Sequence, residues 1–130
     1  MTRRRSDDRG EVTATVILVP VVLIALLFVV QFSLAYYARV VLAGAAQDGA
    51  VAGARQDSSA AVGAALSDQL ISESGTSLLA SHSSTGASTG DTVTVTTTGE
   101  VVSLLPFFGT ITVTATGSAR VEQFEPQGSP

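Results

Sequence analysis

An uninterrupted apolar run near the N-terminus constrains this chain more than any other feature. Residues 16–30 (VILVPVVLIALLFVV) contain no polar side chain, and the wider segment 12–35 is interrupted only by two threonines, a glutamine and a serine. A helix needs about 20 mainly apolar residues to cross the hydrocarbon layer of a membrane. Pro20 falls in the first turns, where we expect a modest bend. The run therefore predicts a transmembrane helix over residues 12–37.

The residues that flank the run predict its orientation. Residues 1–11 contain four arginines, and Tyr36 and Tyr37 follow the run. Basic flanks face the cytoplasm, and aromatic residues gather at membrane interfaces. We therefore expect residues 1–11 to be a basic cytoplasmic leader, with the C-terminal part outside the membrane. The alternative is a secretory signal peptide cut after the small-x-small sequence SLA at 33–35, but the run is longer and more apolar than such a peptide requires.

The composition of the remaining chain excludes several classes of function. After residue 37, three arginines face eight aspartates and glutamates, which disfavours both nucleic acid and anionic lipid surfaces as partners. The chain has no cysteine, so disulfides and thiolate metal sites are excluded. His82 is the single histidine, and we interpret it as a solvated loop residue because metal or acid–base sites need several convergent ligands. We expect no cofactor, no metal and no enzymatic activity; a hydrolase that uses a serine or His82 is the weakest hypothesis.

The first helix is expected to continue beyond the membrane. Residues 38–54 are rich in alanine and lack proline, which favours a helix. Ala45, Gly49 and Gly53 lie four residues apart and form a candidate helix-packing ridge, because small residues let helix backbones approach closely. An alanine-rich helix without a special partner is the alternative. A continuous helix over 12–54 would be roughly 65 Å long.

The extramembrane part is expected to combine a second helix with a pair of strands. A break and an N-cap at 57–59 predict a helix over 60–71, which completes an extracytoplasmic helical region over 38–71. The Ser/Thr/Gly-rich segment 72–90 is interpreted as a loop. Period-two alternation of β-branched residues predicts an antiparallel hairpin within 91–124. Residues 125–130 are expected to be a disordered tail.

The connection between the two strands is unusually apolar for a hairpin tip. It contains four large apolar side chains: Leu104, Leu105, Phe107 and Phe108. These side chains either fold back to cap the helices or form an exposed knob that contacts a partner or the bilayer. The expected fold is α+β: a long N-terminal transmembrane helix that extends outside the membrane, a second short helix and a C-terminal antiparallel β-hairpin.

Several segments together resemble the TadE-like family, the minor pseudopilins of tight-adherence (Flp-type) pilus systems in bacteria. The resemblance rests on Arg9-Gly10-Glu11, Pro20 about ten residues further on, Gln31-Phe32, the helix AGAAQDGAVAGAR and the strands around VVSLLPFFGTITVTATGSARVEQF. It implies cleavage by a prepilin peptidase between Gly10 and Glu11. It also implies other pilin-like subunits and pilus assembly platform proteins as partners.

One position departs from the family's pattern. Pilin-like members typically carry a glutamate about five residues beyond the cleavage point, and Thr15 stands there in this chain. Either Glu11 substitutes for that carboxylate, or the chain is an uncut anchor that supports assembly without entering a filament. Glu11 is also consistent with an ordinary polar flank of a transmembrane helix.

Two classes of function follow from the sequence. The leading hypothesis is a pseudopilin or assembly component of a tight-adherence pilus or a related secretion apparatus, acting through lateral helix packing in the membrane. The alternative is a generic membrane-anchored or secreted binding module that uses the apolar hairpin tip as its contact patch.

Overall fold

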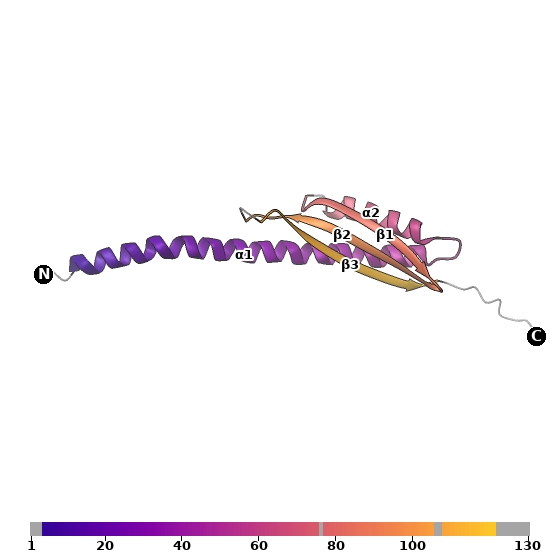
Figure 1. Cartoon of the computed structure of the whole chain (residues 1–130), viewed down its shortest axis with the longest axis horizontal. Coiled ribbons are helices and arrows are strands. Elements are labelled where there is room, and N and C mark those ends of the chain that lie inside the picture. The colour runs from indigo at the N-terminus through magenta and orange to yellow at the C-terminus, as the bar shows by residue number, and fades with distance from the viewer. Residues whose placement is uncertain (1–3, 76, 106–107, 122–130) are drawn as a thin grey trace, which may run out of the picture.

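The computed structural model describes residues 4–75, 77–105 and 108–121, and its elements form an α+β fold. Two helices are followed by three strands: α1 (Arg4–Gly53), α2 (Ala60–Gly75), β1 (Leu79–Thr89), β2 (Thr92–Val102) and β3 (Thr110–Arg120). Figure 1 shows the sheet and α2 gathered around the C-terminal half of α1, while its N-terminal half extends free of the domain. The expected fold class is confirmed, with a third strand added to the predicted hairpin.

Helix α1 has two halves with opposite environments. It runs without interruption for 50 residues, about 75 Å at the usual helical rise. The side chains of residues 8–30 are all exposed, and the first buried side chain along the helix is that of Gln31. The helix is long and apolar enough to cross a membrane, and no part of its most apolar stretch is buried by the rest of the chain. One helix therefore supplies both an exposed, mainly apolar segment, which we call the shaft (residues 12–30), and the central helix of the domain.

The C-terminal half of α1 forms the core because its inward stripe is small. Six apolar side chains of this half are buried, and except for the adjacent Ala45 and Ala46 they follow one another at intervals of three or four residues: Ala38, Leu42, Ala45, Ala46, Ala50 and Ala54. This spacing places them on one side of the helix. They pack in two apolar clusters, one with Ile71, Leu79 and Val101 and the other with Val93 and Val95. The small stripe lets α1 lie close to both α2 and the sheet.

Helices α1 and α2 touch through their backbones at Gly49 and Gly63. A Cβ atom added to Gly49 would clash with the Ser67 side chain and lie 2.5 Å from the Gly63 carbonyl oxygen. A Cβ atom on Gly63 would in turn clash with the carbonyl oxygen of Gly49. The buried Ser67 hydroxyl uses the short separation to donate to the Ala45 carbonyl oxygen at 2.7 Å. The helix pair therefore requires glycine at these two positions.

The sheet is antiparallel, in the order β1-β2-β3, with its inner face on the two helices. Val93, Val95 and Val101 of β2 are buried, and alternating threonines lie on the opposite face. Thr97 is the exception, because its side chain is buried although it carries a hydroxyl group. Its Oγ1 donates to the Leu42 carbonyl oxygen at 2.9 Å, so the hydroxyl is satisfied and bonds the sheet to α1.

Strand β1 corrects the interpretation of residues 72–90 as a loop. Helix α2 continues to Gly75, and Leu79–Thr89 pair with β2 along its whole length. Serine, threonine and glycine occupy both faces of this strand, so its sequence lacks the alternation that predicts a strand. Pairing with β2 and the close approach of α2 at Gly86 define it instead.

The connections between the elements form where the sequence contains residues typical of turns and helix caps. Asp57 adopts a left-handed backbone conformation with φ of 62°, and the Ser59 hydroxyl accepts from the Val62 N–H at 3.3 Å as the N-cap of α2. Gly90, with φ of 60°, allows the tight turn between β1 and β2. The predicted disordered tail, 125–130, and Phe107 lie outside the described residues.

The glycine contact gives a stability prediction. Replacing Gly49 with Leu should lower the free energy of unfolding by about 2–3 kcal/mol, because the new side chain must push α2 away from α1. Gly44→Leu is the matched control, since it lies on the same helix with open space around it. Denaturant unfolding of the full chain in detergent micelles measures both. Equal stability of the two variants would contradict the packing of α2 on Gly49.

Candidate membrane and packing surfaces

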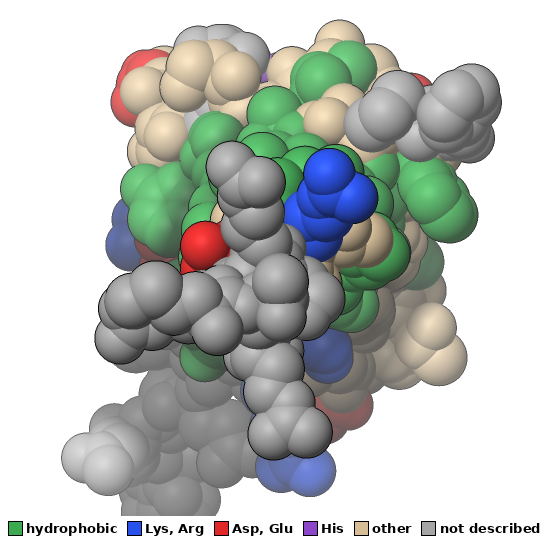
Figure 2. All heavy atoms as spheres, turned by 90° about the vertical axis from the view of Figure 1, so that its left-hand side faces the viewer, with side chains coloured by type: hydrophobic (Ala, Val, Ile, Leu, Met, Phe, Trp, Pro, Cys, Tyr) green, Lys and Arg blue, Asp and Glu red, His purple; other side chains and the backbone are tan. Residues whose placement is uncertain are grey.

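The apolar shaft is the largest exposed hydrophobic surface among the described residues. The large apolar side chains from Val12 to Phe32 are exposed by 37–71%. Hydrophobic side chains also gather around the helix when the molecule is viewed along α1 from its N-terminal end (Figure 2). Water-soluble monomers rarely expose a continuous apolar patch of this size. The shaft is therefore suited to lipid or to other apolar helices.

Gln31 marks the end of the shaft. Its side chain is only 3% exposed although it follows a wholly exposed segment. The Gln31 Oε1 accepts from the Leu104 N–H at 2.7 Å, and its Nε2 donates to the Val102 carbonyl oxygen at 3.4 Å. The side-chain amide thus satisfies two main-chain groups where β2 ends. These bonds hold the β2–β3 connection against α1 at one height along the helix.

The candidate tip presents part of its apolar surface to the outside. Leu104 and Phe108 are 47% and 61% exposed, whereas Leu105 is half-buried. Local bonds order this connection: the Leu105 N–H donates to the Ser103 hydroxyl at 3.2 Å, and the Phe108 N–H donates to the Leu105 carbonyl oxygen at 3.4 Å. The tip does not bury Leu104 or Phe108 against the helices.

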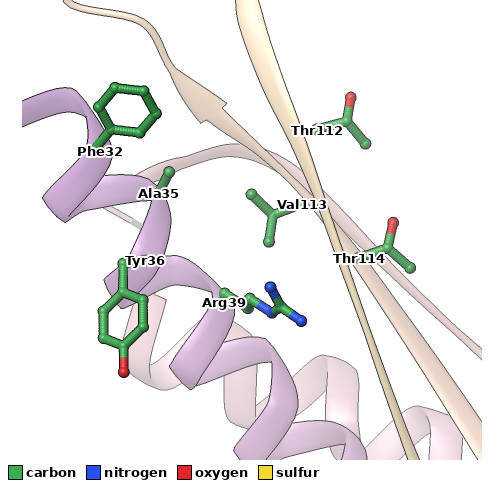
Figure 3. A pocket seen from close by; sticks show the side chains of 7 residues that line it. All are labelled: Phe32, Ala35, Tyr36, Arg39, Thr112, Val113 and Thr114. Atoms are coloured by element: carbon green, nitrogen blue, oxygen red, sulfur yellow. The ribbon is translucent and has the colours of Figure 1, made fainter. Parts of the chain in front are cut away.

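A shallow groove lies between α1 and β3, just above the end of the shaft. It has a volume of about 390 Å³ and seven lining residues: Phe32, Ala35, Tyr36, Arg39, Thr112, Val113 and Thr114. Figure 3 shows the Val113 side chain directed toward α1 and the Arg39 side chain extending from α1 toward β3. The groove combines aromatic rings with one cation, a combination found where proteins meet lipid headgroups.

The predicted helix-packing ridge is occupied within the chain. Ala45 is 5% exposed, and Gly49 and Gly53 are buried. Gly63 of α2 lies against both glycines. A second chain could reach this ridge only if α2 moved away. The lateral contact with partner subunits that the sequence places here stays a prediction, and the ridge's neighbour in the structure is α2.

The candidate cleavage residues, Gly10 and Glu11, are exposed and helical. Both lie in the first turns of α1, and a Cβ atom on Gly10 would meet nothing within 4 Å. Thr15, which stands where pilin-like proteins carry glutamate, uses its hydroxyl to donate to the Glu11 carbonyl oxygen at 2.9 Å. The Gly10–Glu11 bond is thus accessible at the start of the shaft.

His82 is not the solvated loop residue that the sequence suggests. It lies on β1 with 19% of its side chain exposed, and its Nδ1 is 2.7 Å from Asp68 Oδ1 of α2. Its Nε2 is 3.3 Å from the Ser72 hydroxyl, which also donates to the Asp68 carbonyl oxygen at 2.9 Å. The sequence gives no sign of this cluster, because Asp68 and His82 are fourteen positions apart and lie on different elements, α2 and β1.

The Ser72–His82–Asp68 order is that of a serine hydrolase, but its setting is not. A serine nucleophile needs free N–H groups nearby to stabilise the oxyanion. Ser72 lies inside α2, where the helix's own hydrogen bonds use the neighbouring N–H groups. The cluster instead connects α2 to β1. The residues that the structure describes contain no group of three side chains arranged to hold a metal ion.

The fold and these surfaces define a class of protein: an α+β domain packed around the C-terminal half of a helix that is long and apolar enough to cross a membrane. Residues 15–51 match the model of the family described as TadE-like protein, which confirms the TadE-like resemblance over α1. That family is structural and pilus-associated, so the match supports a pilus-associated component at this coarse level. The comparison with curated proteins found no match, and neither did the comparison with solved structures.

The His82–Asp68 pair gives a second prediction. His82→Ala and Asp68→Asn should each lower the free energy of unfolding by about 1 kcal/mol or less, because the pair is partly solvated. A double-mutant cycle should give a coupling of about 0.5 kcal/mol. Ser83→Ala, at an exposed neighbouring position, is the control. Strictly additive effects would show that the two side chains do not interact in solution.

Proposed function

We propose that this protein is a TadE-like pseudopilin or assembly component of a tight-adherence pilus or a related secretion apparatus. One observation carries the proposal: α1 is exposed on every side from residue 12 to residue 30, is apolar there except for Thr13 and Thr15, and continues without a break into the domain core. A rigid connection of this kind transmits the position of the membrane helix directly to the outer domain. Sliding or rotation of the shaft among other helices would move the domain with it.

The shaft acts as the lateral packing surface in this proposal. Helix association in lipid depends on close van der Waals contact, because lipid tails are as apolar as leucine. The ridge at Gly49 and Gly53 is already covered by α2, whereas every side chain of the shaft is exposed. Partners are therefore other pilin-like subunits and the membrane-embedded proteins of the assembly platform, which offer apolar helices at the same depth.

The orientation and processing of α1 complete the proposal. The arginine-rich leader stays in the cytoplasm and the domain lies outside, following the charge asymmetry around the shaft. A prepilin peptidase cuts between Gly10 and Glu11, which leaves the shaft intact. Cleavage there would remove a charged leader from a helix end that is exposed and unpacked.

The experiment that tests this function separates packing from anchoring. Residues 16–30 are replaced by an alternating Leu-Ala sequence of equal length, which keeps a membrane-spanning helix but changes the side chains that partners would contact. The variant should remain in the membrane fraction of the native host and lose co-purification with the pilus proteins. Quantitative mass spectrometry after mild detergent extraction measures both.

Gly44→Leu serves as the control for general damage to α1, because it adds a large side chain outside the shaft and meets open space. It should co-purify with the same proteins as the unchanged chain. If the Leu-Ala variant retains all partners, the shaft is only an anchor. The contact with the pilus proteins would then lie in the outer domain. An unchanged chain that co-purifies with no pilus protein would instead favour the generic membrane-anchored binding module, with its apolar tip as the contact patch.

A further inference from the structure

We infer that the β2–β3 tip is a second membrane contact: Leu104 and Phe108 enter the headgroup–acyl boundary of the bilayer that α1 crosses. This inference rests on the membrane insertion of α1 that is part of the proposed function. It adds a binding surface of the domain itself, with the bilayer as its occupant. The evidence is the height of the tip along α1, the exposure of its side chains and the absence of charged residues from the segment 101–111.

The height follows from the helical rise. Glu11 is the last charged residue before the shaft, and Gln31 is buried by the domain at its other end. Residues 12–31 span about 29 Å at the usual rise per residue, close to the thickness of the hydrocarbon layer, which is about 30 Å. A shaft that fills this layer places Gln31 at its outer boundary. Because the Leu104 N–H donates to Gln31 Oε1 at 2.7 Å, the tip lies at the same boundary.

The direction of the tip agrees with this height. The end of the sheet where β2 stops and β3 begins lies beside α1, on the side of the helix's N-terminal half (Figure 1). It is thus the part of the domain that lies nearest to the shaft. The opposite end of the sheet, at the β1–β2 turn around Gly90, points away. Only one end of the sheet can therefore reach the membrane.

The chemistry of the tip suits a lipid boundary. Residues 101–111 carry no charged side chain, and Leu104 and Phe108 remain 47% and 61% exposed. Above them on α1, Tyr36 and Arg39 line the groove beside β3. Tyrosine is enriched at membrane interfaces, and the long arginine stem lets a guanidinium reach phosphates from apolar surroundings. Apolar, aromatic and cationic groups therefore follow one another in the order of a bilayer's outer half.

The bilayer is favoured over a protein as the occupant because it needs no additional partner. Once α1 spans the membrane, lipid is already present at the level of Gln31, and the tip must meet either lipid or water there. Two contacts, the helix and the tip, would fix the tilt and rotation of the domain, whereas a single helix would leave it free to turn. The tip would thus set which face the outer domain presents to neighbouring subunits.

Tryptophan fluorescence tests the inference, because the natural sequence contains no tryptophan. The full chain is placed in lipid nanodiscs as Phe108→Trp, as Leu104→Trp and as Thr89→Trp, an exposed control at the distal end of the sheet. Lipids brominated near the headgroup should quench roughly half of the emission of the two tip variants, as for an interfacial aromatic ring. The Thr89→Trp emission should be unquenched and typical of water.

Val22→Trp, in the middle of the shaft, separates this inference from the proposed function. Its emission should be quenched most strongly by lipids brominated near the chain ends. Quenching of Val22→Trp without quenching of the tip variants would overturn the tip contact and leave the anchor in place. A blue-shifted tip emission that brominated lipids do not quench would also overturn it, because protein would then cover the tip. An unquenched Val22→Trp would overturn both proposals.

Discussion

Close backbone contact along residues 38–54 of α1 is the constraint on which the rest of the domain depends. The chain has no disulfide and few large apolar residues outside the shaft, so its core cannot rely on bulk. It relies on short separations: Gly49 against Gly63, and the hydroxyls of Ser67 and Thr97 bonded to carbonyl oxygens of α1. A larger residue at Gly49 or Gly63 would push α2 away from α1. A larger residue at Thr97 would push the sheet away from α1.

Helix α1 emerges from the domain at Gln31, and the environment of its side chains changes there from packed to exposed. Above Gln31 the inward side chains are small and packed; below it every described side chain is exposed and most are apolar. Exposure of such a surface to water is unfavourable in free energy, whereas lipid or neighbouring apolar helices would stabilise it. A helix that is long and apolar enough to cross a membrane is therefore continuous with the central helix of the domain, and the match of residues 15–51 to the TadE-like family falls on the same element.

The sequence predicts those parts of the fold whose signals are local. Apolar composition predicts α1, Ser59 predicts the start of α2, and the Thr–Val alternation predicts β2 and β3. Strand β1 cannot be predicted in this way, because Ser, Thr and Gly on both faces carry no periodicity and the strand depends on pairing with β2.

Contacts between distant residues explain the remaining differences. The ridge at Gly49 is recognisable as a packing surface, but the sequence does not tell whether its neighbour is another chain or α2. His82 and Asp68 likewise meet only because β1 forms and α2 extends past Ile71. The height of the tip depends on the Gln31–Leu104 bond, which joins residues 73 positions apart.

We propose that the mature protein retains α1 as one helix, with its N-terminal part in the membrane and its C-terminal part in the domain. The most direct test is the mature N-terminus, read by intact mass and N-terminal peptide analysis of the protein from native membranes. We expect a chain that begins at Glu11, with the whole shaft retained. A chain that begins near Tyr36 would contradict it, because the shaft would then have been removed as a signal peptide.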